Sequence, residues 1–454
     1  MFLGRLAILL ALLCTIPAMA VDHAVRAAAT GADDGTNWDD AFTALPANLT
    51  RGDTYFIADG SYSRYTFDDA GTTRVTVIAA TIASHGPAGG WLNSYAGTAT
   101  FATVPADTTA FLIQADNITL SGAQRTTKTS GHGIFLDCSA STGPFCWAVQ
   151  IDSGVDGVII AFVEIEGTGD AGIATTPTEG VRCIGCTDLT VQSSYIHDCQ
   201  DCMQTGGATT ILYERNTCFN NGTDVVFHGQ AWADEDSDSV VIRYSDFVDI
   251  EGTGGIIVLS REAGSQTAEG WDIYGITFRC ISGSGNGCEF PNGTIACING
   301  ETCTNWRMFN ISVFNVPSGN AGFRCLNGCL GSNRVADNNL WFDVTGAGGI
   351  VLDLALTHDW NTGLNITAGC GWATGGNETC TTTGSSDPYV DAANGDFHLV
   401  AATVAGDTKA SPFNIDPDGN TRGADGTWDR GTFEFLAGAG KPSLQLGRGT
   451  TVRP

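Results

Sequence analysis

The stretch LTVQSSYIHDC at residues 189–199 alternates apolar and polar side chains, and this two-residue period is that of a β-strand. The pattern returns as ILYERNTCFNN at 211–221 and as VVIRYSDFVDI at 240–250. Further copies lie at 158–165, 271–281, 306–316 and 336–344. Most copies reach a small polar residue before a second short strand, namely Asp198, Asn220, Asp249, Asn315 and Asp343.

With Cys280 counted in this series, the equivalent positions are 22, 29, 31, 35 and 28 residues apart. A base period of about 22 with variable insertions is typical of a solenoid whose loops grow from one corner. A single rung cannot bury its own apolar face, so stacked rungs share one core. Asp and Asn at the corner can hydrogen-bond their own turn. The sequence therefore predicts an all-β solenoid of parallel strands and excludes a helical bundle or a doubly wound sheet.

Composition limits the function. The 454 residues include 59 glycines, and charged residues make up only 15%. A net charge of −28 excludes an ordinary nucleic-acid-binding protein, which needs a basic surface. A hydrophobic content of 43% excludes general disorder. Because the chain is so acidic, it would repel an acidic polysaccharide unless calcium or local arginines compensated the negative charge.

The first twenty residues have the pattern of a secretory signal peptide. Arg5 supplies the positive charge, residues 6–16 form an apolar run, and Ala18-Met19-Ala20 is a small-x-small cleavage site. The run is too short to span a bilayer, and no later segment is long and apolar enough to do so. We therefore expect a secreted chain that begins at Val21 and lies outside the cell or on the cell surface.

Sixteen cysteines agree with export, and fifteen remain once Cys14 of the leader is set aside. Pairs close in sequence predict at least four local disulfides among Cys138–Cys146, Cys280–Cys288, Cys297–Cys303, Cys325–Cys329 and Cys370–Cys380. The cluster of Cys183, Cys186, Cys199, Cys202 and Cys218 holds two CxxC pairs, for which zinc binding is the alternative to oxidation. Because this cluster has an odd number of cysteines, one thiol should be left over.

Two end segments add a resemblance. The N-terminal stretches are TGADDGTNWDDAF at 30–42 and RGDTYFIADGSY at 51–62. The C-terminal stretches are DPYVDAANGDFHL at 387–399, DPDGNTR at 416–422 and WDRGTFEF at 428–435. With the central repeats, residues 21–436 resemble the secreted right-handed parallel β-helix proteins of the pectate-lyase-like superfamily. The resemblance implies that fold, and it leaves the activity open because the superfamily includes lyases, hydrolases, epimerases, adhesins and fibre proteins.

The organisation that follows has five parts. We expect a signal peptide at 1–20, an N-terminal cap with the first rungs at 21–100, the parallel β-helix at 101–384, a closing coil at 385–436 and a flexible tail at 437–454. Residues 38–49 are expected to form a short helix or loop that caps the first rung, because an open solenoid end invites end-to-end strand pairing.

The candidate site is expected on the strip of outward side chains in the second strand of each rung. The aligned segments are 201–205, 224–228, 255–259, 287–291, 322–326 and 349–353. Strand alternation then turns Met203, Thr205 and Ile257 outward, and the insertions 229–238 and 260–270 flank the strip. Neighbouring rungs are about 4.8 Å apart, so their side chains can act on one sugar.

Polysaccharide chemistry assigns roles on this strip. A lyase needs a base and a cation that neutralises a uronate, and a hydrolase needs two carboxylates. We expect the catalytic residues to be His228, Arg261, Arg324, Asp224 and Asp201. Substrate-binding residues are expected to be Glu262, Glu289 and Asp353. The lysine base of related lyases has no candidate in the central rungs, and a turn role for Asp198 and Asn220 outweighs a catalytic one.

Two acidic clusters offer oxygen ligands for calcium. Residues Asp416, Asp418 and Asn420 alternate around a glycine, although the bidentate Glu of an EF-hand loop is missing. The second cluster is the segment DEDSD at 234–238, which without calcium is expected to be a solvated loop. Calcium is therefore the one cofactor that the sequence suggests.

The sequence predicts a secreted β-helix that binds extracellular polysaccharide, with a polysaccharide lyase or glycoside hydrolase as the preferred class. The alternative is a non-catalytic surface protein, adhesin or self-assembling filament. An apolar outward strip and an unpaired cysteine fit homo-association. A group of convergent titratable side chains would favour the enzyme.

Overall fold

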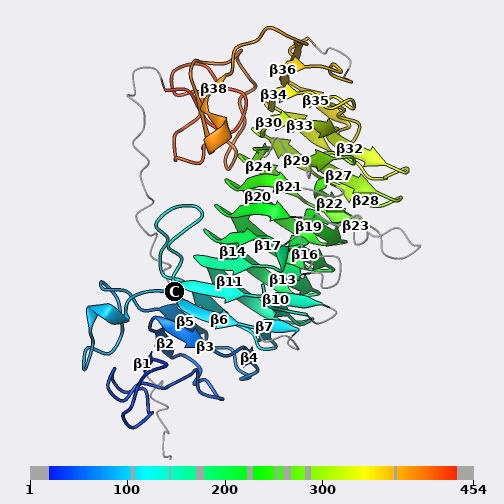
Figure 1. Cartoon of the computed structure of the whole chain (residues 1–454). Helices are drawn as coiled ribbons and strands as arrows, with labels where there is room; N and C mark the ends of the chain where they lie inside the picture. The colour runs from blue at the N-terminus through cyan, green and yellow to red at the C-terminus, as the bar shows by residue number, and fades with distance from the viewer. Residues whose placement is uncertain are drawn as a thin grey trace, which may run out of the picture.

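A computed structural model describes residues 20–103, 108–142, 145–169, 178–221, 229–250, 254–258, 267–281, 288–372 and 376–436. Three parallel sheets stack coil upon coil into an elongated solenoid (Figure 1). Strands that follow one another along the chain belong to different sheets, and each sheet gains about one strand per coil. The protein is a right-handed parallel β-helix, as the repeats and the resemblance predict.

We name the three sheets A, B and C. Sheet A contains β1 (Asp22–Val25), β2 (Thr54–Ile57), β5 (Val75–Ala79), β8 (Ile118–Ser121), β11 (Asp156–Ala161), β14 (Thr187–Gln192), β17 (Thr209–Glu214), β20 (Asp238–Arg243), β24 (Asp272–Tyr274), β29 (Arg307–Phe309), β33 (Val335–Asp337) and β35 (Thr357–Asp359). Sheet B contains β3 (Gly60–Tyr62), β6 (Ala99–Ala102), β9 (Ile134–Asp137), β12 (Val163–Glu166), β15 (Tyr195–His197), β18 (Thr217–Asn221), β21 (Asp246–Ile250), β25 (Thr277–Arg279), β30 (Ser312–Val316), β34 (Leu340–Val344), β36 (Thr362–Ile366) and β37 (Thr379–Cys380). Sheet C contains β4 (Tyr65–Phe67), β7 (Thr109–Ile113), β10 (Cys146–Ile151), β13 (Thr178–Ile184), β16 (Asp201–Gly206), β19 (Gln230–Glu235), β22 (Gly254–Val258), β27 (Ile295–Ile298) and β32 (Phe323–Leu326).

Short elements complete the chain. The parallel pairs are β23 (Thr267–Glu269) with β28 (Thr302–Thr304) and β26 (Glu289–Phe290) with β31 (Ser318–Gly319). The antiparallel pair β38 (Tyr389–Asp391) and β39 (Asp396–Leu399) belongs to the closing coil, and one-turn 3₁₀ helices lie at Asn93–Tyr95 and Ala392–Asn394. Residues 38–49 form a loop with Trp38 and Leu49 buried, which is the loop form of the expected cap.

The corner between sheets B and C is built as the repeats predict. The five polar residues at this corner have left-handed backbone angles, with φ between 49° and 58°: Asp198, Asn220, Asp249, Asn315 and Asp343. Asp and Asn tolerate this conformation better than other non-glycine residues because their side chains bond locally. Asn220 Nδ2 donates to Asp198 Oδ1 at 2.5 Å, and Ile281 N donates to Asp249 Oδ1 at 2.6 Å. The polar repeat therefore holds the chain reversal on successive coils.

The core is one continuous stack of apolar columns. Register joins Phe247 on β21 to Phe278 on β25, and their ring centroids are 5.0 Å apart. Trp271 and Trp306 stack at 4.9 Å on neighbouring coils. Each coil contributes only a few side chains, so burial depends on the coils above and below.

Four of the five predicted local disulfides form: Cys280–Cys288, Cys297–Cys303, Cys325–Cys329 and Cys370–Cys380. Two further disulfides, Cys183–Cys186 and Cys202–Cys218, take four of the five cysteines for which zinc was the alternative.

The prediction of a Cys138–Cys146 disulfide is wrong for this structure, in which both residues are buried thiols. Cys199 is a third buried thiol, so three are left over rather than one. Cys138 and Cys146 contact each other by a side-chain hydrogen bond instead of a covalent bond.

The alignment of second strands is wrong on two coils. Strand β16 pairs with β19 through Asp201 and Gln230, so the strand of that coil starts at 230 and not at 224. Strand β22 pairs with β27, so the next coil uses 295–298 and not 287–291. On these two coils the extra residues come before the strand rather than after it. Residues 229–238 are therefore mostly strand β19 and not a flanking insertion.

Two outward assignments are also wrong. Met203 and Thr205 point into the core and are fully buried. Asp234, expected in a solvated acidic loop, is also fully buried, and Thr205 Oγ1 donates to its Oδ1 at 2.5 Å. Burial raises the pKa of Asp234 to about 7.

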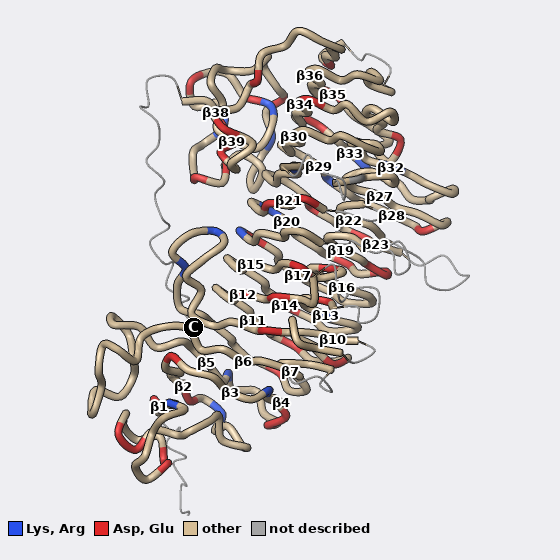
Figure 2. The backbone as a smooth tube through the Cα atoms, viewed as in Figure 1, with Lys and Arg blue, Asp and Glu red and all other residues tan. Residues whose placement is uncertain are grey.

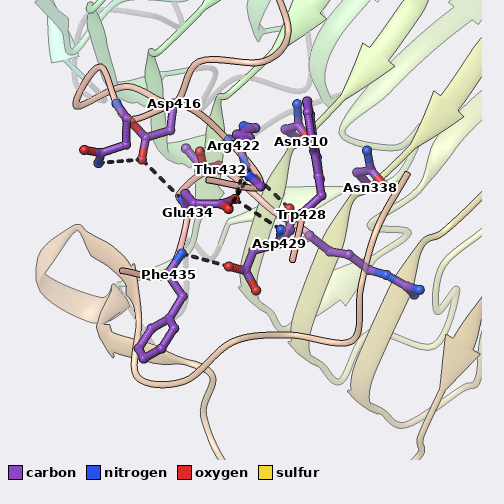
Figure 3. A network of polar contacts seen from close by, with 12 residues as sticks. Asn310, Asn338, Asp416, Arg422, Trp428, Asp429, Thr432, Glu434 and Phe435 are labelled. Carbon is purple, nitrogen blue, oxygen red and sulfur yellow. Dashed lines mark hydrogen bonds and ion pairs between the residues drawn. The ribbon is translucent and has the colours of Figure 1, made fainter. Parts of the chain in front are cut away.

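The closing coil packs against the solenoid beside β30 and β34 (Figure 1). Figure 3 shows the polar network of this coil around Asp416, Asp429 and Glu434. Buried Arg422 donates to the carbonyl of Thr432, and Trp428 Nε1 donates to Asn310 Oδ1 of the solenoid at 3.2 Å. The network fixes the coil over one half of sheet B.

Candidate functional site

The outward face of sheet B carries two columns of side chains in exact strand register. Column 1 consists of Glu164, Tyr195, Thr217 and Asp246 on β12, β15, β18 and β21. Column 2 consists of Glu166, His197, Phe219, Val248 and Arg279 on β12, β15, β18, β21 and β25. Neighbouring members are about 4.8 Å apart along the solenoid axis. Titratable groups therefore converge on this face from consecutive coils.

An excursion of residues 122–133 between β8 and β9 lies beside column 1, and its cyan loop stands out from the solenoid in Figure 1. At its tip, Lys128 Nζ lies 2.5 Å from Asp246 Oδ2. Nearer its base, Arg125 Nη1 donates to the carbonyl of Arg215 at 2.9 Å. Figure 2 shows the positive charge on this loop. The excursion thus brings two cations to the central coils.

The excursion also contributes a buried histidine. His132 Nδ1 lies 3.7 Å from Glu164 Oε2, and His197 Nε2 lies 3.6 Å from Glu164 Oε1. Neither ring nitrogen of His132 has a hydrogen-bond partner among the described residues. Glu164 therefore lies between two imidazoles, while about a quarter of its side chain stays exposed.

The second histidine is held more tightly. His197 Nδ1 lies 2.7 Å from Asp198 Oδ2, and the His197 ring stacks on Tyr195 with centroids 4.3 Å apart. Asp198 also accepts from Asn220, so the corner residue serves both the turn and the cluster. We call His132, Glu164, Glu166, His197 and Asp198 the His–Glu cluster.

The pKa values of the cluster's members are shifted in different directions, so the members differ in protonation state. The nearby imidazoles of His132 and His197, 3.7 and 3.6 Å from its carboxylate oxygens, lower the pKa of Glu164 to about 2. Burial alone would lower the pKa of His197, but Asp198 and Glu164 raise it to about 9. Burial raises the pKa of Glu166, whose carboxylate has no hydrogen-bond partner among the described residues. At neutral pH, the face therefore holds an ionised Glu164, a protonated His197 and a Glu166 that accepts a proton more readily than an exposed Glu.

Five of the predicted site residues fall wholly or partly outside the described structure. Asp224, His228, Arg261 and Glu262 fall outside the described residues. Glu289 lies on β26 rather than on the strip, and the described structure does not include its side chain. These five residues stay predictions.

Arg324 and Asp353 lie together on the outward side of sheet C. Arg324 Nε is 3.4 Å from the Asp353 carboxylate, which also accepts from Cys325 N at 2.7 Å. Asp201 is buried at the start of β16, where its Oδ1 accepts from Gln230 N at 2.9 Å. The structure therefore brings Arg324 to Asp353 but does not join either residue to the His–Glu cluster on sheet B.

The predicted calcium ligands form a self-contained turn. Asp416 Oδ1 accepts from the backbone nitrogens of Asp418 and Asn420 at 3.0 and 2.8 Å. Asp418 Oδ2 instead lies 2.6 Å from His398 Nε2. Within the described part of the chain, no group of three or more His, Cys, Asp or Glu side chains is arranged to hold a metal. Calcium at this turn stays an untested prediction.

Sequence reasoning missed the cluster although part of its signal was visible. The fragments VEIE at 163–166 and YIH at 195–197 alternate within the repeats, so their polar members had to face outward. His132 and Lys128 carried no such signal, because they lie in a non-repetitive excursion. Lys128 reaches Asp246 from a segment 118 residues earlier in the chain, which the repeats do not reveal.

A shallow hollow of about 370 Å³ lies on the outward face of sheet A, between Leu212, Val241 and Pro412. Two of its charged lining residues, Arg243 and Asp272, already pair with residues beside the hollow. Arg243 Nη2 lies 2.7 Å from Glu214, and Arg307 Nε lies 2.5 Å from Asp272. The hollow therefore offers less free chemistry than the face of sheet B.

No protein-family model and no curated protein matches the sequence. Among solved structures, the pectate lyase Pel9A is similar over 92% of this chain and 97% of its own, with 12% identity and a TM-score of 0.48. The PL6 family alginate lyase AlyGC is similar over 70% of this chain and 49% of its own, with 12% identity and a TM-score of 0.35. The surface adhesin PfbA of Streptococcus pneumoniae is similar over 64% of this chain and 83% of its own, with 10% identity and a TM-score of 0.31.

These similarities are in fold, and they assign no activity to this chain. Among the residues that the structure describes, no helix is long and apolar enough to cross a membrane. The functional argument therefore depends on the His–Glu cluster itself.

Proposed function

We propose that this protein is a secreted enzyme that cleaves the glycosidic bonds of an extracellular polysaccharide on the outward face of sheet B. The observation that carries the proposal is a pair of carboxylates on one strand whose pKa values move apart, with Glu164 lowered to about 2 and Glu166 raised. Such a separation assigns one group as the ionised partner and the other as the acid. Glycoside hydrolysis needs one carboxylate that is ionised and one carboxylic acid that donates a proton.

The positions of the two carboxylates fit that chemistry. Glu164 and Glu166 are two residues apart on β12 and both face outward, so their Cα atoms are about 7 Å apart. Side chains of that length reach the separations of about 5–5.5 Å and 6.5–9.5 Å that retaining and inverting enzymes use. Glu166 would protonate the leaving oxygen, and Glu164 would serve as nucleophile or as base for water.

The surrounding groups would bind and position the sugar. Phe219 is half-buried and would offer its ring to the apolar side of a sugar, while the ring of Tyr195 already stacks on His197. Protonated His197 supplies a fixed positive charge beside both carboxylates, which stabilises charge that develops during bond cleavage.

Proton abstraction by a lyase is the second candidate, and Lys128 with Arg125 supports it. Both cations stand at the same face of a strongly acidic chain, where they could neutralise a uronate carboxylate. In that reaction Glu166, once ionised, would be the base. The two candidates differ in product, since only a lyase forms an unsaturated sugar end.

The test is a panel of polysaccharides incubated with the full mature chain, with new reducing ends and unsaturated ends measured separately. The hydrolase proposal expects reducing ends without unsaturation, and expects both Glu164→Gln and Glu166→Gln to abolish them. Glu269→Gln, an exposed glutamate on β23, is the matched control and should keep full activity. Unsaturated products that disappear in Lys128→Ala would support the lyase instead.

A non-catalytic surface or filament protein would bind members of the panel, or assemble, without releasing any product. Outward Ile257 belongs to a small buried cluster with Ala296 and Ile298, so the described part of that strip is already covered. Homo-association therefore stays a prediction, which sedimentation of the mature chain tests.

A further inference from the structure

The chain joins the hydrogen-bond network of the fold at Val21. The backbone nitrogen of Val21 donates to Asp53 Oδ1 at 2.9 Å, and its carbonyl accepts from Thr54 N at 3.0 Å. Strand β1 begins at the next residue. Ala20, which precedes it, is exposed. Among the described residues, which start at Ala20, Val21 is the first with both its backbone nitrogen and its carbonyl hydrogen-bonded.

The acceptor of that first hydrogen bond is a buried carboxylate. Only 7% of the Asp53 side chain is exposed. Its Oδ2 lies 2.8 Å from His23 Nε2, and the His23 ring stacks on Tyr55 with centroids 4.8 Å apart. A buried carboxylate is costly unless a cation and hydrogen bonds compensate its charge. Among the described residues, the histidine is the one side chain in ion-pair contact with Asp53.

The sequence places a cleavage motif immediately before this contact. Ala18-Met19-Ala20 ends the predicted leader, so the bond expected to break is Ala20–Val21. The nitrogen released by that cleavage is the atom that already lies 2.9 Å from Asp53.

We propose that removal of the leader completes this site by placing the new α-ammonium of Val21 against Asp53. A peptidase that cuts after small residues adds one water to the Ala20–Val21 bond. The carbon–nitrogen bond breaks, Ala20 leaves with a carboxylate, and Val21 keeps the nitrogen as an amine that takes up a proton at neutral pH. A neutral amide donor becomes a charged donor with three hydrogens, and the buried carboxylate of Asp53 gains a counter-ion at the surface of the fold.

Maturation therefore stabilises the N-terminal end of the solenoid by an ion pair that the precursor lacks. Charge-assisted hydrogen bonds are stronger than neutral ones, and screening is weak where a partner is buried. The effect should depend on pH. The ion pair raises the pKa of the amine above its reference value of about 8, so the stabilisation is complete below that pH and disappears as pH rises through the folded-state pKa.

The first experiment identifies the terminus. Intact mass and N-terminal sequencing of the protein recovered from the medium or envelope of an exporting host should give a chain that starts at Val21. A start at any other residue, or an uncleaved chain in the exported fraction, overturns the proposal.

The second experiment compares urea unfolding of the chain 21–454 with a free amine, with an acetylated amine, and with one added residue, Ala20. At pH 6.5 the free amine at Val21 should lower the unfolding equilibrium constant about tenfold relative to both other forms. The difference should vanish at pH 11, where the amine is neutral. Equal stability of the three forms at pH 6.5 overturns the proposal.

Two variants isolate the partner. In Asp53→Asn, the free and acetylated chains should unfold alike, because the buried carboxylate is gone. In Asp22→Asn, which removes an exposed neighbouring charge, the tenfold difference should persist. A difference that survives Asp53→Asn would mean that the ammonium acts elsewhere, and this too overturns the proposal. None of these measurements depends on enzymatic activity.

Discussion

The lower and upper halves of the outward face of sheet B share one backbone but carry different chemistry. In the lower half, from β12 to β21, the two columns hold Glu164 and Glu166, which stay partly accessible, and His197, which is buried. In the upper half, from β30 to β36, the same register positions hold Phe314, Phe342 and Leu364. The closing coil covers these apolar residues with Tyr389, Phe397 and Phe433.

The comparison shows that the residue type found at an outward strand position depends on what covers that position. A strand position that faces outward is free to be charged where solvent or ligand reaches it. The same position must be apolar where another segment packs on it, because unpaired buried charge is costly. The lower half is therefore suited to a site and the upper half to stability, and substitutions in matched positions should affect different properties.

The largest effect is expected from Glu166→Gln in the lower half. Loss of a general acid should reduce the cleavage rate about a thousandfold, while the free energy of unfolding should change by less than about 1 kcal/mol. Initial rates and urea unfolding on the same preparation measure both quantities. A rate within threefold of the wild type would remove Glu166 from the mechanism.

The next effect is expected in the upper half. Phe342 is 7% exposed beneath the closing coil, so Phe342→Ala should lower the free energy of unfolding by about 3 kcal/mol. Phe219→Ala is the matched control, since Phe219 occupies the same column in the lower half but is only half-buried. Urea unfolding should show a loss for Phe219→Ala of about 1 kcal/mol. Equal losses would show that the two halves do not differ in packing.

A smaller effect concerns Glu164 and acid. The pKa of Glu164 is lowered to about 2 from an ordinary 4.5, so its ion pairs stabilise the fold above pH 4.5 and this contribution disappears as pH falls toward 2. Glu164 is partly exposed, and after allowance for screening Glu164→Gln should lower the free energy of unfolding by about 1–2 kcal/mol at pH 6. The gap between variant and wild type should narrow below pH 4.5 and close only as the pH falls below 2. A gap independent of pH would assign the loss to packing.

The smallest effect is expected in the closing coil, at His398. Its Nδ1 lies 2.5 Å from Asp396 and its Nε2 lies 2.6 Å from Asp418. Burial opposes the charged form, but the two aspartates raise the pKa of His398 to about 9. The stabilisation is complete below pH 6.5 and disappears as pH rises through 9. His398→Gln should therefore lower stability by about 0.5–1 kcal/mol at pH 6 and by nothing at pH 10.

Limited proteolysis of the closing coil at both pH values measures the His398 effect. His85→Gln, in the N-terminal region, is the control and should leave the cutting rate of the coil unchanged. Faster cutting of the wild-type coil at pH 6 than at pH 10 would reverse the sign and refute the pairing.

Sequence reasoning succeeded where one coil repeats another. The corner residues Asp198, Asn220 and Asp249 predict the turn, because each coil must reverse the chain in the same way. It failed at the strand after Asn221, because an insertion of unknown length shifts the next strand and the hydrophobic pattern alone does not say on which side of the strand the insertion lies. Met203 and Thr205 were turned outward although their strand was placed correctly, because alternation separates two faces without saying which one is buried.

The sequence by itself determined the parallel solenoid, its polar corner and most of its local disulfides, since each depends on residues close in the chain or on a repeated period. Only the tertiary structure decided the site. Lys128 is 118 residues from Asp246 and His132 is 32 residues before Glu164, and no period links them. An excursion has no repeat to reveal where it lies, so its contacts are decided by the face on which it packs. Which half of sheet B the closing coil covers was decided in the same way, by where that coil docks.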